Sequence, residues 1–416
     1  MNTNKKKIIN DPVFGFLTIR SELIFDLIEH PYFQRLRRIR QLGLSSLVYP
    51  GANHTRFEHA LGAVHLMQEA VLALQMKGVE ISDREAEAVI CAILLHDIGH
   101  GPFSHALEHS IVNGVSHEHL SLLLMESLNK DFDGALELTI AVFKNCYPRK
   151  FLHQLVAGQL DIDRLDYLRR DSFFTGVSEG VIGSDRIIKM MDVRNDELVI
   201  EVKGIYSVEK FLQARRMMYW QVYLHKTVLS AEHLMMNVLR RAKELSMHGD
   251  ALFATPPFSI FLKNEITLDC FRNGYVFLGR SLLDNFAQLD DADVLASIKV
   301  WQFHPDMILS YLSSSIINRR LFRVKVRDKP FSSGKIDRLQ QQIVEHFDVG
   351  TDEVAYFFVS ESITNSVYVE GNDKINVLYK NGKIKEIDRA SDMNLLKTSQ
   401  PVRKYFVCYP KELDIK

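Results

Sequence analysis

An apolar stretch that ends in a histidine and an aspartate places the strongest constraint on this chain. In AILLHDIGHGPFSHALEH, from Ala92 to His109, an apolar stretch of helical character ends at His96 and Asp97. More histidines lie around the Gly-Pro turn that follows. A packed core gains little from so many titratable imidazoles. Neutral imidazole and carboxylate groups are the ligands that divalent first-row metals prefer. The stretch therefore predicts helices that converge on a metal site.

Histidine is concentrated in this part of the chain. Nine of the 16 histidines lie between His54 and His119, far more than an even spread would place there. A lone histidine is usually a structural residue, but a cluster with interleaved acids favours a shared metal. Candidate ligands stand in three separate segments: His59 in RFEHA, His96 and Asp97 in LLHDIGH, and Asp163 in LDIDRLDYLRRD.

The acidic segment LDIDRLDYLRRD admits two interpretations. If it is helical, Asp163 shares a face with Tyr167 and with either Arg170 or Asp171, because side chains three and four residues apart are neighbours on a helix. Such a face would turn a carboxylate toward the histidines. The alternative is a solvated amphipathic helix whose acids and arginines form ion pairs at the surface.

Hydrophobic periodicity predicts a mainly α fold over most of the chain. Between about residues 24 and 321 apolar residues recur at helical spacing, with helices expected over 55–78 and 82–99. The second of these opens with Ser82 and Glu85, the pattern of a capping box. One interruption, DELVIEVKGIY, alternates like a strand or a short hairpin.

The pattern changes after Leu321. β-branched and aromatic residues predominate in LFRVKVRD, EVAYFFVS, INVLYKNGKIKEID and KYFVCYP, and Asn381-Gly382 is a hairpin turn signal. A loop is expected near 391–401. We therefore expect a helical domain over residues 1–320, with its metal core at about 50–171, and a smaller C-terminal α+β region over 321–416.

Charge and cysteine content narrow the class of protein. The formal net charge of −1 provides no global field for nucleic acid or an anionic membrane. The four cysteines lie far apart and form no CxxC pair, as is typical of a reducing compartment. The first residues lack the apolar stretch of a signal peptide, and the apolar run from Ala88 to Leu95 is too short to span a bilayer. We expect a cytoplasmic protein without a membrane partner.

Several motifs in order resemble one family. RFEHALG, HDIGHGPFSH and DIDRLDYLRRD resemble the HD-domain metal-dependent phosphohydrolases. IINDPVFG, FQRLRRIRQLG, YPGANHTRFEHALG and YLHKT are similar to one branch, the deoxynucleoside triphosphate triphosphohydrolases that include the sterile-alpha-motif/HD enzyme and the bacterial dGTPase-like proteins. The resemblance extends from about Lys7 to Asn237. It implies an HD-domain helical core.

The resemblance implies a metal-dependent reaction. By the family pattern a divalent ion (Fe, Mn, Zn, Ni or Mg) is held by His59, His96, Asp97 and Asp163. The ion would activate a water for attack at the α-phosphorus of a deoxynucleoside triphosphate, releasing a deoxynucleoside and intact triphosphate. The alternatives are an HD phosphohydrolase acting on another phosphate ester, such as a nucleoside monophosphate, and a nucleotide-sensing protein with little turnover.

The remaining site residues follow from the same resemblance. His100, His105, His117 and Glu108 correspond to the catalytic group, in which His105 matches the proposed acid for the leaving 5′-oxygen and Glu108 replaces the aspartate usual in animal members. Contacts to the triphosphate fall on Arg56, Arg164, Arg215, His225 and Lys226. Contacts to sugar and base fall on Gln41, Leu42, Tyr167, Asp171 and Tyr223, with Tyr167 crowding the 2′ position and Asp171 accepting from the 3′-hydroxyl.

The N-terminal segments resemble a regulatory nucleotide site that assembles at subunit contacts. Lys7, Asn10, Gln34 and Arg37 match contact positions there, which implies a homo-oligomer, a dimer or a tetramer, and a deoxynucleoside triphosphate as possible activator. The alternative is that RLRRIR forms a solvated basic helix face, or one that binds a nucleic acid backbone weakly.

Overall fold

Two long helices, α3 (Arg56–Met76) and α12 (Lys226–Met247), form the centres of two packed groups of elements. The computed structural model describes residues 7–112, 114–365, 374–392 and 402–413. Helices dominate both groups, which confirms the mainly α fold expected from the sequence.

The remaining elements are numbered in chain order. The other helices are α1 (Glu22–Glu29), α2 (Pro31–Gln34), α4 (Asp83–Leu95), α5 (Ser104–Ser110), α6 (His117–Asp131), α7 (Glu137–Phe143), α8 (Lys150–Val156), α9 (Ile162–Thr175), α10 (Ser184–Met190), α11 (Ile205–Met218), α13 (Pro256–Lys263), α14 (Leu268–Arg272), α15 (Leu282–Phe286), α16 (Asp291–Trp301), α17 (Met307–Ile317), α18 (Ser333–Phe347) and α19 (Ile387–Ala390). The strands are β1 (Lys7–Asp11), β2 (Gly15–Ile19), β3 (Met191–Arg194), β4 (Glu197–Glu201), β5 (Val276–Phe277), β6 (Arg280–Ser281), β7 (Arg323–Arg327), β8 (Val359–Asn365), β9 (Asn376–Leu378), β10 (Ile384–Glu386) and β11 (Val402–Tyr409).

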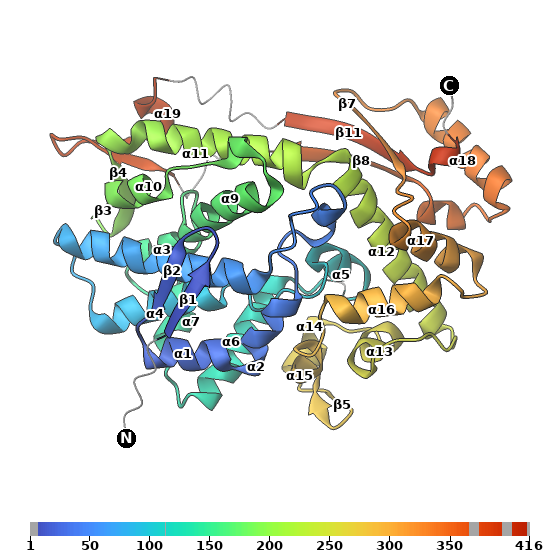
Figure 1. The fold of residues 1–416 in the computed structure, drawn as a ribbon, viewed down its shortest axis with the longest axis horizontal. Helices are drawn as coiled ribbons and strands as arrows, with labels where there is room; N and C mark the ends of the chain where they lie inside the picture. Colours follow the sequence, from blue (N-terminus) through green and yellow to red (C-terminus); the bar gives the residue numbers. More distant parts are fainter. Residues whose placement is uncertain (1–6, 113, 366–373, 393–401, 414–416) are drawn as a thin grey trace.

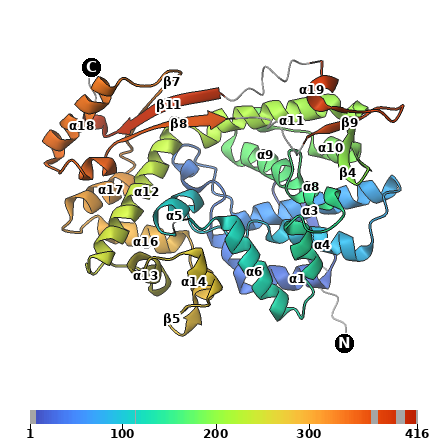
Figure 2. The ribbon, with the colours of Figure 1, turned by 180° about the vertical axis from the view of Figure 1, so that it is seen from behind.

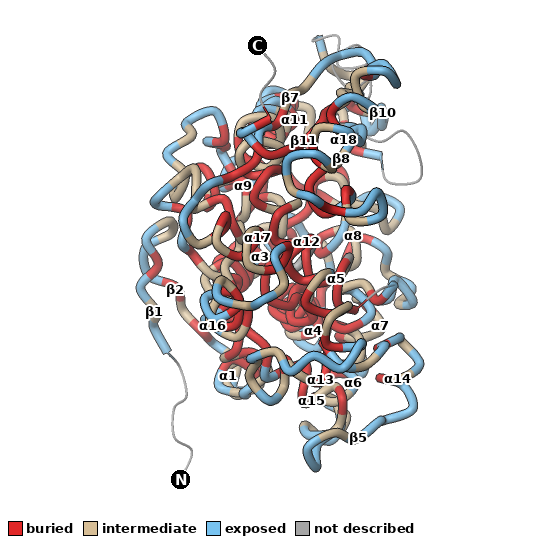
Figure 3. Tube along the Cα trace, turned by 90° about the vertical axis from the view of Figure 1, so that its right-hand side faces the viewer, coloured by how far each residue is buried: buried red, intermediate tan, exposed pale blue. Residues whose placement is uncertain are grey.

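The two groups lie side by side in both face-on views. Figure 1 shows α3, α4 and α9 on the left and α12, α13, α16 and α17 on the right, and Figure 2 shows the same separation from behind. In Figure 3 the buried part of the trace runs through the middle of the molecule. The described part of the chain contains no helix that is both long and apolar enough to cross a membrane.

Side-chain caps set the starts of the helices that carry the metal-site residues. In α4 the Ser82 hydroxyl accepts from the backbone N–H of Glu85, and the Glu85 carboxylate accepts from the N–H of Ser82, as the capping box predicts. The helix ends at Leu95 rather than at Gly99. Tight turns take over there, because the N–H groups of Ile98 and His100 bond carbonyls only three residues back.

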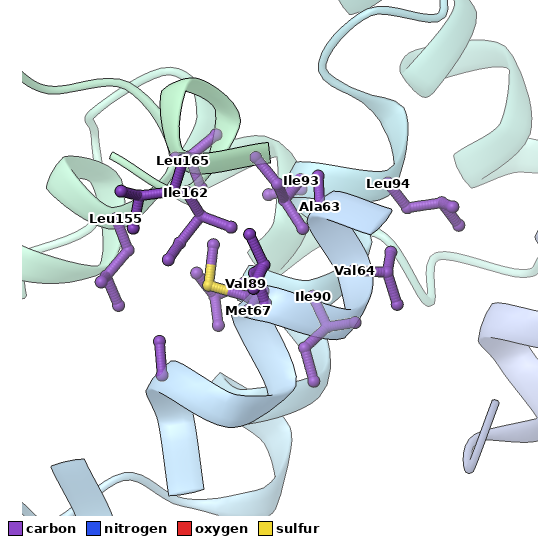
Figure 4. Packing of buried hydrophobic residues seen from close by; sticks show 14 of the residues in the cluster. Ala63, Val64, Met67, Val89, Ile90, Ile93, Leu94, Leu155, Ile162 and Leu165 are labelled. Carbon is purple, nitrogen blue, oxygen red and sulfur yellow. The ribbon is translucent and has the colours of Figure 1, made fainter. Parts of the chain in front are cut away.

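Apolar side chains from three helices hold the first group together. Figure 4 shows Val89 and Ile93 of α4 packed with Met67 of α3 and with Ile162 and Leu165 of α9. All five are fully buried. Because each fully buried apolar side chain contributes about 1.5–3 kcal/mol, this packing fixes the relative positions of the three helices.

The C-terminal strands enter two different sheets. Strands β7, β11 and β8 form an antiparallel sheet that packs against α12, and Figure 2 shows α18 beside it. The β9–β10 hairpin, with its turn at Asn381-Gly382, instead pairs with β4 and completes a four-stranded sheet with the β3–β4 hairpin. The segment EVAYFFVS is not one strand: Glu353–Tyr356 is a 3₁₀ turn, and β8 begins at Val359. Most of the loop expected at 391–401 lies outside the described residues.

Candidate metal centre and adjoining cavity

Three side chains from three elements converge at the centre of the first group. His59 comes from the second turn of α3, His96 caps the C-terminus of α4, and Asp163 lies in the first turn of α9. The Oδ1 atom of Asp163 lies 3.1 Å from His59 Nε2 and 3.4 Å from His96 Nε2. One ligand atom from each of the three lies within 4.8 Å of the others.

The donor atoms of this cluster fit a divalent cation. The Nε2 atoms of His59 and His96 are buried, and neither has a well-directed hydrogen-bond partner among the described residues. Buried polar atoms are almost always satisfied, so two orphaned imidazole nitrogens facing one carboxylate indicate a missing common partner. Two imidazoles and a carboxylate suit Zn, Fe or Mn.

Asp97 adds a second carboxylate to the cluster. Its Oδ1 atom lies 3.4 Å from His96 Nε2, and its Oδ2 atom lies 3.8 Å from His59 Nε2. Arg56 Nη1 donates to the same Oδ2 atom at 2.5 Å, so Asp97 also links the cluster to a cationic side chain. The four ligands expected from the family pattern are thus brought together.

A buried chain of polar groups orients His59 from behind. His59 Nδ1 donates to Asp166 Oδ2 at 2.7 Å, Arg170 donates to both oxygens of Asp166, and Arg170 Nη1 reaches Asp11 at 2.7 Å. Donation from Nδ1 leaves the lone pair of Nε2 for a metal. His96 is oriented in the same way by donation from Nδ1 to the carbonyl of Ile93, at 2.7 Å.

Sequence reasoning missed Asp166 and Arg170 as supports of the metal centre. A usable signal was present, since Asp166 stands three residues after Asp163 and four before Arg170, the spacing of helix neighbours. Asp166 and Arg170 are completely buried. The alternative of a solvated helix for this segment is therefore wrong.

Opposite charges are balanced inside the cluster. Burial lowers the pKa of His59, but the adjacent carboxylates of Asp163 and Asp166 raise it to about 10. Burial raises the pKa of Asp163, yet His59 and His96 hold it below its usual range. A cation bound here would replace these protons, as is usual for metal binding to histidine.

A second imidazole pair lies next to the cluster. The rings of His100 and His117 stack with centroids 3.8 Å apart, and His117 Nδ1 lies 3.0 Å from Glu108 Oε1. Burial, followed by the nearby charge of Arg56, lowers the pKa of His100 well below its usual value. His105 lies in α5, and its side chain is outside the described part of the structure.

Arg35 braces the loop that carries His100. Its guanidinium is completely buried and donates to the carbonyl oxygens of Ile98 at 2.6 Å and His100 at 3.0 Å. Neighbouring Arg38 forms an ion pair with Asp290. RLRRIR is therefore not a uniformly solvated basic face, because the side chain of its first arginine is buried and donates hydrogen bonds inside the protein.

A cavity of about 630 Å³ opens from the cluster toward α12. This volume is in the range of small-molecule sites. Of the residues expected to bind substrate or act in catalysis, its lining contains Gln41, Leu42, Arg56, Asp97, His100, His117, Asp163, Arg164, Tyr167, Asp171 and Tyr223.

The α9 face that lines the cavity is the one with Asp163, Tyr167 and Asp171. Asp171 is buried and accepts from Tyr223 OH at 2.7 Å and from His54 Nε2 at 2.8 Å. His54 was not anticipated as a partner of Asp171, although it belongs to the histidine cluster and stands just before the RFEHALG motif. Tyr167 packs edge-on against Tyr223, with centroids 6.2 Å apart.

Three expected phosphate contacts lie outside this lining. Arg215 is buried in α11 and reaches Gln159 Oε1 at 3.5 Å. His225 caps the N-terminus of α12 by accepting from the N–H of Thr227, and Lys226 is exposed beside it.

The expected regulatory residues lie on β1 and on the segment from α2 to the turn after it. Lys7 forms an ion pair with Glu29 at 3.3 Å, and Asn10 is exposed on the β1–β2 hairpin. Arg37 Nε donates to Gln34 Oε1 at 2.8 Å, and its guanidinium stacks over Phe57.

Comparisons with known proteins agree with this architecture. The HD domain model matches residues 56–170, and the model of the HD associated region matches residues 182–253. The crystal structure of a phosphohydrolase from Bacteroides thetaiotaomicron superposes with a TM-score of 0.92 at 55% identity, covering 97% of this chain and 99% of that chain.

Two curated relatives extend the comparison. The uncharacterized protein YwfO of Bacillus subtilis is 32% identical over 99% of this chain and 93% of its own length. The deoxynucleoside triphosphate triphosphohydrolase SAMHD1 homolog of Dictyostelium discoideum is 32% identical over 59% of this chain and 51% of its own length. This chain thus spans about half of that second relative.

Proposed function

Because this chain belongs to the HD-domain phosphohydrolase family, we propose that it hydrolyses deoxynucleoside triphosphates to deoxynucleoside and triphosphate. One observation carries the proposal: the His59–His96–Asp163 cluster opens into a cavity of about 630 Å³ that is also lined by arginines and tyrosines. Such a cavity offers a metal and cations to a polyphosphate, and aromatic surface to a nucleoside. The SAMHD1 relatives support the same substrate class.

The metal end of the cavity suits attack on a phosphate. A divalent cation held by His59, His96, Asp97 and Asp163 would lower the pKa of water and polarise the phosphorus centre. Arg56 and Arg164 line the same cavity and would offset the negative charge of the triphosphate.

Histidines beside the metal cluster suit proton transfer to the leaving 5′-oxygen. Glu108 fixes the ring of His117, which stacks on His100. His105 follows on α5, and we assign to it the delivery of the proton, with His117 assisting.

The nucleoside end of the cavity suits a deoxyribose. Tyr167 would occupy the space of a 2′-hydroxyl, and Asp171 would accept from the 3′-hydroxyl. Gln41 Oε1 is buried with no hydrogen-bond partner among the described residues, so it is available to a sugar hydroxyl. Leu42 and Tyr223 would pack against the sugar and the base.

Regulation belongs to the same proposal. Lys7, Asn10, Gln34 and Arg37 would bind a second nucleotide at a contact between subunits of a dimer or tetramer. Residues 321–416 would contribute to these contacts. Turnover that appears only when two different nucleotides are mixed would support this site, and equal turnover with single nucleotides would argue against it.

A product assay tests the proposed reaction. Purified protein is incubated with each of the four dNTPs and Mn²⁺, Fe²⁺ or Mg²⁺, and the products are separated by chromatography. We expect deoxynucleoside and triphosphate from the wild type and at least a 1,000-fold loss for His96→Ala, since removing a metal ligand abolishes roughly 4 kcal/mol or more of transition-state stabilisation. His248→Ala, at an exposed histidine, is the matched control. Orthophosphate from a monophosphate panel would assign another phosphate ester, and tight binding without turnover would assign a sensor.

A further inference from the structure

Glu232 is an acidic residue in the wall of the main cavity that the proposed chemistry does not use. It lies in α12, whereas Asp163 in the same lining comes from α9, and Figure 1 shows these two helices apart, α9 to the left and α12 to the right. Among the elements that pack against α12 are α5 and the 3₁₀ turn Gly43–Leu47. They contribute Leu44, Phe103 and Ala106 to the cavity lining.

Glu232 is half-buried, and its carboxyl group has no partner among the described residues. It forms no hydrogen bond and no ion pair with any described residue, and burial raises its pKa to about 7. Three arginines line the same cavity, and none of them forms an ion pair with Glu232. Arg56 pairs with Asp97 and Arg164 with Asp161, and the charge of Arg40 lies near Asp291. Burying part of an unpaired carboxyl group costs free energy. An unpaired carboxyl group in a cavity wall is typical of a ligand-binding site.

The position of Glu232 defines what that ligand must offer. The metal ligands and the phosphate-binding arginines Arg56 and Arg164 come from the starts of α3 and α9 and the end of α4. Leu42, which we place against the sugar and base, adjoins the Gly43–Leu47 turn that packs on α12, so we place the base toward α12. In its ionised form, which two donors from a base would favour, the carboxylate presents two acceptors and no donor. Guanine offers two adjacent donors on its pairing edge, N1–H and the 2-amino group. Adenine and cytosine offer one amino donor beside an acceptor, and thymine offers one N–H between two carbonyls.

We propose that Glu232 reads the pairing edge of the base and makes this site prefer guanine and disfavour thymine. The inference rests on the proposed function, because it takes the occupant of the cavity to be a nucleotide. Glu232 is a specificity-determining residue, and it is not needed for the attack on phosphorus.

The test compares dGTP with dITP, which lacks only the 2-amino group. For the wild type we expect kcat/KM to be about tenfold lower with dITP than with dGTP, the loss expected when one hydrogen bond to a carboxylate is missing. In Glu232→Gln this ratio should fall to about one, and the preference for dGTP over dTTP should shrink. Glu126→Gln, which removes an exposed carboxylate on α6, is the matched control and should keep both ratios.

Two outcomes would overturn the role of Glu232. The first is equal kcat/KM for dGTP and dITP in the wild type, a comparison that needs no variant to fold. The second is an unchanged dGTP to dITP ratio in Glu232→Gln. If the wild type turns over no dNTP, the proposed function has failed instead. Calorimetric binding of dGTP and dITP then tests Glu232 separately, and equal dissociation constants would overturn the inference.

Discussion

At the scale of single residues, Asp166 decides which nitrogen of His59 faces the metal. The Asp166 carboxylate accepts the Nδ1 proton of His59 and is itself held by two hydrogen bonds from Arg170. All three side chains are completely buried, so no water competes for these bonds. The orientation of the ligand is therefore set by a residue that does not touch the metal.

Replacing Asp166 by asparagine should weaken metal binding about 10- to 100-fold, because the amide no longer favours the Nδ1–H tautomer of His59. Arg170 keeps its ion pair with Asp11, so the protein should still fold. Competition titration with a chromophoric chelator measures the affinity. Asp185→Asn, at an exposed acid beside Arg169, is the control. Equal affinities for Asp166→Asn and the wild type would show that the hydrogen bond has no role in binding.

Asp291 gives a pH-dependent contribution to stability. Burial raises its pKa to about 6 in the folded protein, so the folded state holds this proton more tightly than the unfolded chain does. The resulting stabilisation is fully present below the unfolded pKa and is lost as the pH rises through about 6. Between pH 5 and pH 7.5 it should decrease by about 1 to 1.5 kcal/mol.

Asp291→Asn removes this titration. Urea unfolding at pH 5 and pH 7.5 should show the variant gaining that amount relative to the wild type as the pH rises. A difference in unfolding free energy that stays constant with pH would contradict the assignment.

At the scale of elements, one glycine sets how closely α3 approaches α9. A Cβ atom at Gly62 would lie 2.0 Å from Asp166 Oδ1 and 2.1 Å from Arg170 Nη2. The missing side chain therefore makes room for the ion pair that supports His59. The absence of a side chain at Gly62 therefore permits both the close packing of α3 on α9 and the orientation of His59.

Gly62→Ala should destabilise the protein by about 1–3 kcal/mol, since extra volume in a packed core forces neighbours to move. It should also weaken metal binding, because Asp166 is displaced from His59. Gly334→Ala in α18, where nothing lies within 4 Å of the added carbon, should be neutral or stabilising by up to about 1 kcal/mol. Thermal unfolding and metal titration of both variants measure these effects. Similar behaviour of the two alanines would refute the packing argument.

The elements show where sequence reasoning succeeds and where it stops. Helix starts such as Ser82 could be predicted because a capping box is a local pattern. The choice between Arg170 and Asp171 could not, because residues four apart on a helix drift by roughly 40° around the axis. That drift carries Asp163, Tyr167 and Asp171 along the cavity side, while Arg170 turns to Asp166.

The contacts between elements that are far apart in the chain could not be predicted from the sequence. The β9 strand pairs with β4, far away in the chain, and no local pattern specifies that partner. Likewise, the sequence does not distinguish Glu232 from other acidic residues on an amphipathic helix. Only the position of α12 beside the cavity identifies it as a lining residue. Local signals fix single elements, and packing between distant elements decides which side chains meet.

At the scale of the whole molecule, the site lies where the two groups of elements meet. The metal-site residues come from α3, the end of α4 and α9, whereas Leu224 and Glu232 come from the start of α12 and the turn before it. Each group has its own apolar core. A nucleotide in the cavity would contact both groups.

In the reaction that we propose, water attacks the α-phosphorus of a deoxynucleoside triphosphate. Turnover of dGTP in water enriched in ¹⁸O, followed by mass spectrometry of both products, tests it directly. We expect intact triphosphate carrying one ¹⁸O atom and a deoxynucleoside carrying none, because the bond from phosphorus to the 5′-oxygen breaks. Label in the deoxynucleoside, or release of orthophosphate or pyrophosphate in place of triphosphate, would contradict it.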